Sequence, residues 1–174
     1  TIANTVESAF YIPGYGMQTA AATLAGNALG AKDNRKMQEF ARMNLLVEVI
    51  LMIISGSLLF IFAPFMMDIF SDSPEVIRLG ASVLRMVAVS EPFYGVSIII
   101  EGMMQGVGRT VKPFVYNCIG MWGIRIVGTF IFINFFSGGL ISAWGCMIAH
   151  NMFLFVLYFI HWISGKWNPL NSKA

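Results

Sequence analysis

The stretch from Ser90 to Thr110 places a carboxylate on a helix that is otherwise apolar. At 100° per residue, its polar side chains share one helical face, and they are Ser90, Tyr94, Ser97, Glu101 and Gln105. A carboxylate at membrane depth is costly unless it is paired, protonated or hydrated. We therefore expect Glu101 to take up a proton or to supply oxygen ligands to Na⁺. The alternative is a hydrogen-bonded Glu101 near the end of its helix, where its charge reaches water.

A second polar face lies near the start of the chain, where Asn4, Glu7 and Tyr11 fall on the same side of the first predicted helix. Their oxygen groups suit the binding of a cation. The competing interpretation places Glu7 at the outer headgroups, where its charge is solvated.

Arg125 lies near the middle of an apolar helix, too deep to reach water easily. An unpaired arginine at this depth is expensive. We expect Arg125 either to pair with one of the deep acids, Glu7, Glu91 or Glu101, or to face a water-filled cavity. The first arrangement is a structural lock between helices, and the second belongs to a transport pathway.

The composition is that of a membrane protein. Of the 174 residues, 57% are hydrophobic and only 11% are charged, whereas soluble domains carry about 25% charge. The net charge of +2 is too small to indicate nucleic acid binding. Cys118, Cys146 and His150 lie in apolar runs, and we interpret them as packed side chains. Because the sequence contains no metal motif, phosphate loop or nucleophile–base arrangement, it predicts neither an enzyme nor a bound cofactor.

Five hydrophobic segments are long enough to cross a bilayer, which needs about 20 apolar residues. They cover approximately residues 1–29, 38–63, 77–106, 113–136 and 140–163. Together they predict an all-α polytopic membrane protein, with one transmembrane lobe over residues 1–165 and a polar tail at 166–174.

Prolines predict where these helices start, bend or end. We expect a kink or break at Pro13, a break at Pro64, a helix start at Pro74 and a bend at Pro92. Glu48 follows the charged connection closely and is expected to lie near the headgroups.

Basic residues alternate between the predicted connections. The first and third connections and the tail hold eight of the 11 basic residues, which are Lys32, Arg35, Lys36, Arg42, Arg109, Lys112, Lys166 and Lys173. The second connection is acidic. The positive-inside rule therefore predicts that the basic connections and the C-terminus are cytoplasmic.

The chain begins with Thr1 inside a predicted helix. With an odd number of predicted spans and no internal repeat, it reads as the C-terminal part of a longer transporter bundle. We expect an N-terminal lobe of the same transporter to be the partner of this one.

Four stretches follow the pattern of a known transporter family, and they are PGYGMQTAAATLAGNALGAKD, EPFYGVSIIIEGMMQGVGRT, MWGIR and GLISAW. In this order, and over nearly all of the chain, they resemble helices of the multidrug and toxic compound extrusion (MATE) family. The resemblance implies the C-terminal part of a twelve-helix transporter with two bundles, beginning within its eighth helix. It also implies a multi-pass inner-membrane antiporter, driven by H⁺ or Na⁺, that exports drugs or other cationic or amphiphilic compounds by alternating access.

The sequence departs from this family pattern at three positions. Gln105 stands where the family usually has arginine, and Arg109 stands where it has aspartate. Tyr94 occupies the place of an aspartate that takes part in coupling in some members, so we take Glu101, on the same helical face, as its substitute. The candidate ion- and substrate-binding residues are therefore Glu101, Glu7, Tyr94, Gln105, Asn4 and Arg125.

Two other functions stay open. A flippase for lipid-linked oligosaccharides, from the same superfamily, would favour several deep basic residues for phosphate, and only Arg125 is deep here. A non-transporting membrane scaffold would give no reason for polar faces inside the helices. The expected partners are the lipid bilayer, small organic cations or amphiphiles, and the missing lobe, but no nucleic acid.

Overall fold

The computed structural model describes residues 2–136 and 139–171, and every regular element in these ranges is helical. The elements are α1 (Ile2–Gly30), α2 (Asn34–Phe70), α3 (Pro74–Gly106), α4 (Val111–Cys118), the π-helix η1 (Ile119–Ile126), α5 (Val127–Phe136), α6 (Leu140–Ile163) and the short 3₁₀ helix η2 (Pro169–Asn171). Because α4, η1 and α5 follow one another directly, they form one continuous rod. The predicted all-α fold class is confirmed.

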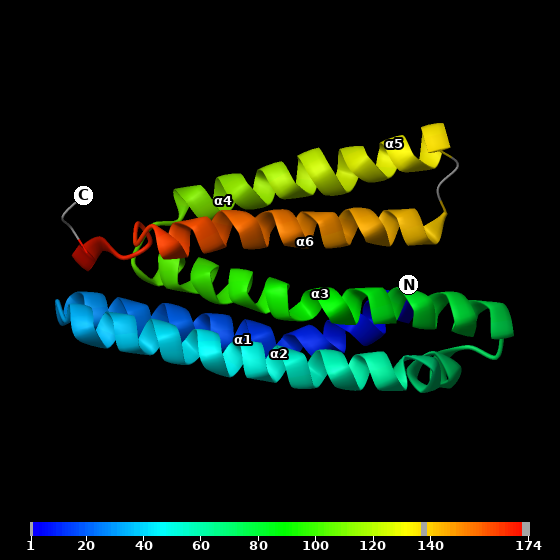
Figure 1. Cartoon of the computed structure of the whole chain (residues 1–174), viewed down its shortest axis with the longest axis horizontal. Helices are drawn as coiled ribbons and strands as arrows, with labels where there is room; N and C mark the ends of the chain where they lie inside the picture. The colour runs from blue at the N-terminus through cyan, green and yellow to red at the C-terminus, as the bar shows by residue number, and fades with distance from the viewer. Residues whose placement is uncertain (1, 137–138, 172–174) are drawn as a thin grey trace.

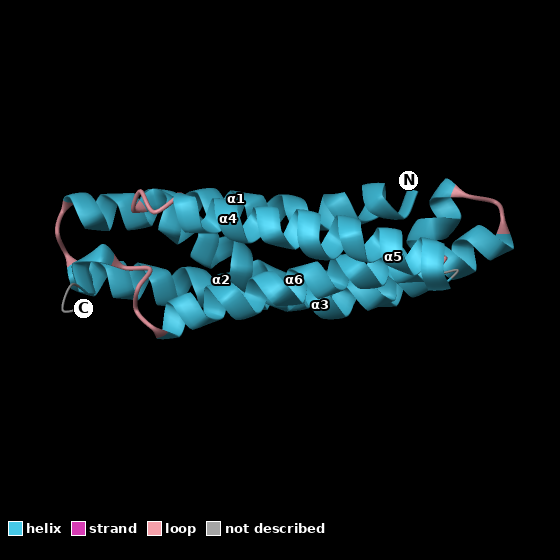
Figure 2. Cartoon of the chain, turned by 90° about the horizontal axis from the view of Figure 1, so that it is seen from above, coloured by secondary structure: helices cyan, strands magenta, loops and turns pink. Residues whose placement is uncertain are grey.

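Helix α3 lies at the centre of the bundle (Figure 1). On one side it packs against α1 and α2, which also contact each other, and on the other side it packs against α6. The rod of α4, η1 and α5 packs mainly on α6. Figure 2 shows that all of these helices run along the same long axis. Helix α3 therefore shares an interface with both parts of the bundle.

The interface of α1 with α3 is built from small and flexible side chains. Ala21, Ala25 and Ala28 are buried on one face of α1, where they share a core cluster with Met103 and Met104 of α3. Small residues allow helices in a membrane to approach closely, and methionine fills irregular gaps.

Two glycines of α3 bring the α1 backbone into direct contact. A Cβ atom at Gly102 would lie 2.5 Å from the carbonyl oxygen of Gln18, and one at Gly106 would overlap the backbone of Ala22. Gly102 and Gly106 are four residues apart and therefore lie one above the other on α3. Only glycine leaves room for this approach.

The prolines interrupt the helices less than the sequence predicts. Helix α2 continues through Pro64 to Phe70, so the predicted break is wrong. Helices α1 and α3 also continue through Pro13 and Pro92, where a kink and a bend stay predictions. Within a bilayer, backbone polar groups must find protein partners, and a continuous helix satisfies most of them. Pro74 does begin α3, as predicted, because the first turn does not need its missing N–H.

The turn between α1 and α2 is fixed by Asp33, which caps α2. Its Oδ1 accepts a hydrogen bond from the backbone N–H of Lys36 at 3.0 Å. This hydrogen bond, and then the charge of Lys36, lower the pKa of Asp33 below its ordinary value. Because the pKa of Asp33 is lower in the folded state, its ionised carboxylate stabilises the fold at pH values above the unfolded-state pKa. This stabilisation is lost as the pH falls through the folded-state pKa.

Four helices in the described part of the chain are long and apolar enough to cross a membrane. They are Asn34–Phe70, Pro74–Gly106, Val111–Asn134 and Ile141–Ile163. Helix α1 runs along α2 and α3 but is not among them, so a fifth span at its position stays a prediction.

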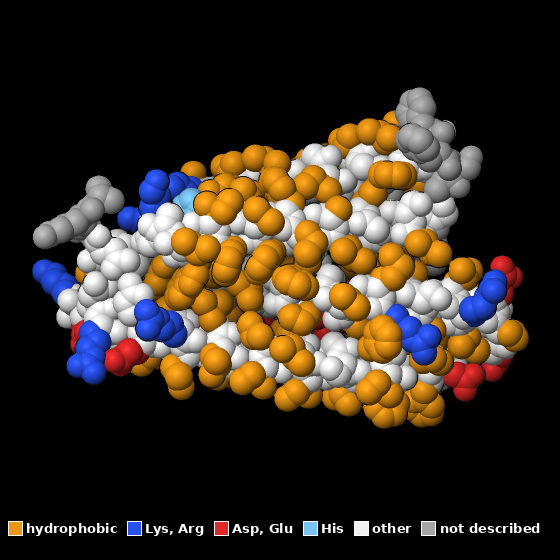
Figure 3. Space-filling view, in the orientation of Figure 1, with side chains coloured by type: hydrophobic (Ala, Val, Ile, Leu, Met, Phe, Trp, Pro, Cys, Tyr) orange, Lys and Arg blue, Asp and Glu red, His pale blue; other side chains and the backbone are white. Residues whose placement is uncertain are grey.

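On the face that Figure 3 shows, many hydrophobic side chains are exposed between the two ends of the bundle, as suits a lipid-facing surface. Exposed side chains of α2 include Ile50, Ile54 and Ile61. The α1–α2 turn, the α3–α4 connection and the C-terminal segment all lie at one end, and the α2–α3 connection lies at the other (Figure 1). The basic connections therefore share one end, as their alternation in the sequence predicts.

Replacing Gly106 by alanine is expected to destabilise the bundle, because the added Cβ overlaps Ala22 and forces α1 away from α3. We expect a loss of about 1–3 kcal/mol, measured as a lower unfolding temperature of the purified protein in detergent. The matched control is Gly16→Ala in α1, where nothing lies within 4 Å of the added Cβ. Equal unfolding temperatures for Gly106→Ala and the wild type would contradict the close helix contact.

Candidate coupling and substrate sites

Glu101 lies in a hydrogen-bonded network between α3 and α4. Its Oε1 accepts hydrogen bonds from Nε2 of Gln105 at 3.0 Å and from Nδ2 of Asn117 at 2.9 Å. The hydroxyl of Tyr158 on α6 also interacts electrostatically with this carboxylate, although it lies outside hydrogen-bond geometry. The sequence predicted that Gln105 shares a helical face with Glu101, but it could not reveal Asn117, which comes from another helix.

The Glu101 network opens into a cavity of about 450 Å³ between α3 and the α4–η1 rod. Gln105 and Asn117 line its polar wall, and Phe114, Met121 and Trp122 line the rest. A carboxylate beside aromatic and methionine side chains suits a ligand with a positive charge and an apolar body.

Tyr94 connects the two polar faces that the sequence predicts. Its hydroxyl interacts with Tyr15 of α1 and lies within electrostatic reach of both Glu101 and Glu7. Glu7 is only 2% exposed, so its side chain faces the interior of the bundle. The side chain of Asn4 lies outside the described part of the structure, and its predicted role stays a prediction.

Glu48 is an interior acid that the sequence analysis placed at the headgroups. Its side chain is 0% exposed between α1 and α3, so that prediction is wrong. Glycines on both neighbouring helices make room for it: a Cβ at Gly14 would lie 3.0 Å from Glu48 Oε1, and a Cβ at Gly95 would lie 3.2 Å from the same atom. The sequence feature that could have identified Glu48 as interior was the position of Gly14 and Gly95. Their positions become informative only once it is known which helices lie side by side.

Glu91 occupies a similar position between α3 and α2. Its side chain is 0% exposed, and a Cβ at Gly56 of α2 would lie 3.2 Å from its Oε2. Glu7 lies within electrostatic reach and carries the same type of charge. Among the described residues, no group donates a hydrogen bond to the carboxyl of Glu48 or Glu91. Because an isolated charge in an apolar interior is too costly, each carboxyl must take up a proton or bind a cation.

Arg125 lies in the π-helix η1, a type of segment that frequently occurs at functional sites. It lines a cavity of about 220 Å³ together with Thr129, Trp144 and Met147. The part of the chain that the structure describes gives Arg125 no ion pair, and neither Glu91 nor Glu101 approaches it. Of the two predicted arrangements, the structure therefore favours the cavity.

His150 fixes the contact between α6 and η1. A Cβ at Gly120 would overlap its imidazole ring, which is buried. Neither ring nitrogen has a hydrogen-bond partner within the described ranges. His150 therefore packs between the two helices, but in the described part of the chain it lacks the hydrogen bond expected of a packed histidine.

A family model described as MatE matches residues 1–131, which is most of this chain. The chain belongs to the MatE family. The resemblance inferred from the sequence is therefore confirmed.

Curated relatives of this MatE chain are named for drug resistance and extrusion. The chain is 26% identical over 162 residues to the probable multidrug resistance protein NorM of Thermotoga maritima, and the match covers 93% of this chain and 35% of the relative. It is 26% identical over 166 residues to the multidrug and toxin extrusion protein 1 of Homo sapiens, with 94% of this chain and 29% of the relative covered. The chain thus spans about a third of the length of these relatives.

Solved structures share the fold of this chain. A MOP superfamily transporter from Pyrococcus furiosus, described as having a binding pocket of reverse polarity, matches with a TM-score of 0.87 at 22% identity, over 99% of this chain and 39% of that one. An inward-facing multidrug resistance MATE family transporter of the same superfamily matches with a TM-score of 0.85 at 18% identity, over 99% and 40%. These likenesses confirm the polytopic membrane fold.

In this MatE chain, the predicted site residues fall into separate groups. Glu101 and Gln105 are in contact, and Tyr94 lies within electrostatic reach of Glu101 and Glu7. Arg125 lies apart from them, in a cavity formed with α6. The sequence therefore identified one neighbourhood on α3 and one isolated cation on the rod beside α6.

The absence of an ion pair at Arg125 predicts the behaviour of the Arg125→Gln variant. Removing an arginine from a buried ion pair lowers the free energy of unfolding by about 3–5 kcal/mol. Removing an arginine that faces a cavity lowers it by about 0.5 kcal/mol or less. We expect the unfolding temperature in detergent to stay within about 2 °C of the wild type. Arg125→Lys, which keeps the charge, is the control. A fall of about 10 °C in Arg125→Gln alone would restore the structural-lock interpretation.

Proposed function

We propose that this chain is the C-terminal lobe of a cation-coupled antiporter that exports organic cations or amphiphilic drugs by alternating access. The observation that carries this proposal is the pair of interior carboxyls, Glu48 and Glu91, which receive no hydrogen bond from any described group. A carboxyl group inside a membrane is stable there when a bound proton or cation neutralises its charge. Such groups are therefore suited to bind and release a coupling ion. The NorM relative and the human extrusion protein, by their names, support drug export.

We take H⁺ as the coupling ion in preference to Na⁺. A Na⁺ site needs several converging oxygen ligands. A single carboxyl is sufficient to carry a proton. Glu48 and Glu91 each meet this requirement separately.

The cavity beside Glu101 is the proposed substrate site of this lobe. Its carboxylate can pair with a positive charge, while Phe114, Met121 and Trp122 can contact an apolar body. Glu91 and Glu101 both belong to α3. A change in the packing of α3 against α1 and α2 on protonation would therefore reach the substrate cavity through one rigid element.

We further propose that the protein is a multi-pass protein of the inner cell membrane with its C-terminus in the cytoplasm. The basic α1–α2 turn, the α3–α4 connection and the C-terminal segment share one end of the bundle (Figure 1). Excess lysine and arginine is typical of cytoplasmic connections.

The variants Glu48→Gln and Glu91→Gln test the coupling role in the full-length protein. Glutamine keeps the shape of the side chain but cannot exchange a proton, so we expect folding to be retained and gradient-driven export to fall by about tenfold or more. The measurement is efflux of a fluorescent organic cation from proteoliposomes under an imposed pH gradient, with a Na⁺ gradient as the second arm.

The matched control for this experiment is Glu39→Gln, which removes a surface carboxylate of α2 whose Oε1 lies 2.9 Å from Nε of Arg35. It should export at the wild-type rate. Wild-type export by both interior variants would remove the basis of the proposal, and activity driven by the Na⁺ gradient alone would replace H⁺ with Na⁺.

Glu101→Gln tests the substrate role. The glutamine carbonyl can still accept hydrogen bonds from Gln105 and Asn117, so the fold should remain intact. Loss of the charge is expected to raise the apparent KM for a cationic substrate about fivefold or more and to leave that for a neutral amphiphile unchanged. Equal changes for both substrates would contradict a charge-selective site.

A further inference from the structure

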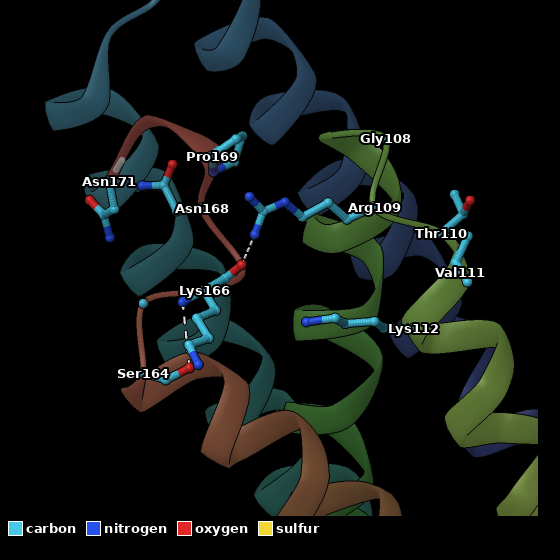
Figure 4. A pocket seen from close by; sticks show the side chains of 11 residues that line it. Gly108, Arg109, Thr110, Val111, Lys112, Ser164, Lys166, Asn168, Pro169 and Asn171 are labelled. Atoms are coloured by element: carbon cyan, nitrogen blue, oxygen red, sulfur yellow. Dashed lines mark hydrogen bonds between the residues drawn. The ribbon is translucent and has the colours of Figure 1, made fainter. Parts of the chain in front are cut away.

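A cavity of about 960 Å³ opens at the basic end of the bundle, between the α3–α4 connection and the C-terminal segment (Figure 4). Residues 108–112 form one wall and residues from Ser164 to Asn171 form the other. Its charged lining residues are Arg109, Lys112 and Lys166, and no acidic residue is among those that line it. The cavity is therefore strongly cationic.

The three cations converge from separate segments. Arg109 reaches across the cavity and donates a hydrogen bond to the backbone carbonyl oxygen of Lys166 (Figure 4). Lys112 lies below it on α4, with its Nζ 3.2 Å from Nε2 of His161. In the described part of the chain none of the three forms an ion pair. Their positive charge is thus available to a ligand.

The acids at this end of the bundle are already paired with their own neighbours. Asp33 lies 3.7 Å from Lys36 Nζ, and Glu39 pairs with Arg35 at 2.9 Å. The C-terminal segment is held on α2 by neutral groups, since Asn168 Nδ2 donates to Asn34 Oδ1 at 2.9 Å. Neither acid therefore neutralises the cavity.

The backbone adds to the positive potential of the cavity. Helix α4 begins at Val111, in the cavity wall, and the N–H groups of a first helical turn have no acceptor within the helix. These groups and the helix dipole favour an anion. Gly108, with φ of +77°, makes the tight turn that brings α4 to this position.

Apolar side chains flank the cavity on the outside of the bundle. Val111 is 73% exposed at the start of α4, and Ile163 is 69% exposed at the end of α6. A small soluble anion would gain no binding energy from this apolar surface. The acyl chains of a lipid would cover it and remove it from water.

We propose that this cavity binds the phosphate headgroup of an anionic phospholipid from the adjoining leaflet, with its acyl chains along α4 and α6. Basic pockets between transmembrane helices on the cytoplasmic side are suited to such headgroups. The lipid would join the α3–α4 connection to the C-terminal segment and so stabilise the packing of the rod on α6. This role is independent of the ion and substrate roles proposed for Glu48, Glu91 and Glu101.

The test compares lipid-dependent stability of the full chain in detergent on addition of phosphatidylglycerol or phosphatidylcholine. We expect a rise in unfolding temperature with phosphatidylglycerol only. Each cation near a headgroup contributes about fivefold in affinity, so Lys112→Gln and Lys166→Gln together should raise the concentration of phosphatidylglycerol that gives half of the effect by roughly 25-fold.

The matched control is Lys32→Gln with Lys36→Gln, which removes the same charge from the same end of the bundle but outside the cavity. It should leave the lipid response unchanged. Equal losses in both double variants would show diffuse attraction and overturn the site, as would the absence of a preference for phosphatidylglycerol in the wild type. The single variants, each expected to lose about fivefold, decide the question if the double variant does not fold.

Inorganic phosphate is the second probe, because it has the headgroup chemistry without acyl chains. Stabilisation by millimolar phosphate equal to that by phosphatidylglycerol would assign the cavity to a free anion and overturn the lipid proposal. Stabilisation by the lipid alone supports it.

Discussion

The carboxyl groups of Glu48 and Glu91 lie inside the bundle of α1, α2 and α3, and no described group donates a hydrogen bond to them. If either carboxyl were charged and unpaired, its desolvation would cost more free energy than the packing around it contributes, because a bundle interior solvates charge poorly. The stability of this part of the chain is thus tied to the neutralisation of two side chains. Ion binding and helix packing are therefore physically linked in this bundle, which is the link that the coupling proposed for this chain requires.

Close backbone contact is the second constraint, and it places these carboxyls. Gly102 and Gly106 allow α1 to lie directly on α3, while Gly14, Gly56 and Gly95 leave room for the side chains of Glu48 and Glu91. Helix α3 takes part in all of these contacts except that of Gly14 with Glu48, and it also carries Glu101. Its other side packs on α6. Glu91 and the cavity beside Glu101 are therefore attached to the same helix, although they face different neighbours.

The two ends of the bundle differ in the chemistry that they offer to the membrane. The end with the C-terminal segment gathers basic side chains, and Arg109, Lys112 and Lys166 surround a cavity there (Figures 3 and 4). The middle of the bundle is covered by apolar side chains that suit lipid tails. The proposed orientation and the proposed lipid site thus rest on the same asymmetry of charge, since the basic residues typical of cytoplasmic segments also attract anionic headgroups.

Composition and local patterns were enough to predict the helical class, the helix start at Pro74, the family and the shared face of Glu101 and Gln105. These features depend on composition or on neighbours three or four residues apart, which helical periodicity describes directly. Only the tertiary structure decided that Glu48 is interior, that Asn117 donates to Glu101 and that Arg125 faces a cavity. Each of these depends on which helix lies opposite and at what rotation, and that is set by packing between segments distant in the sequence.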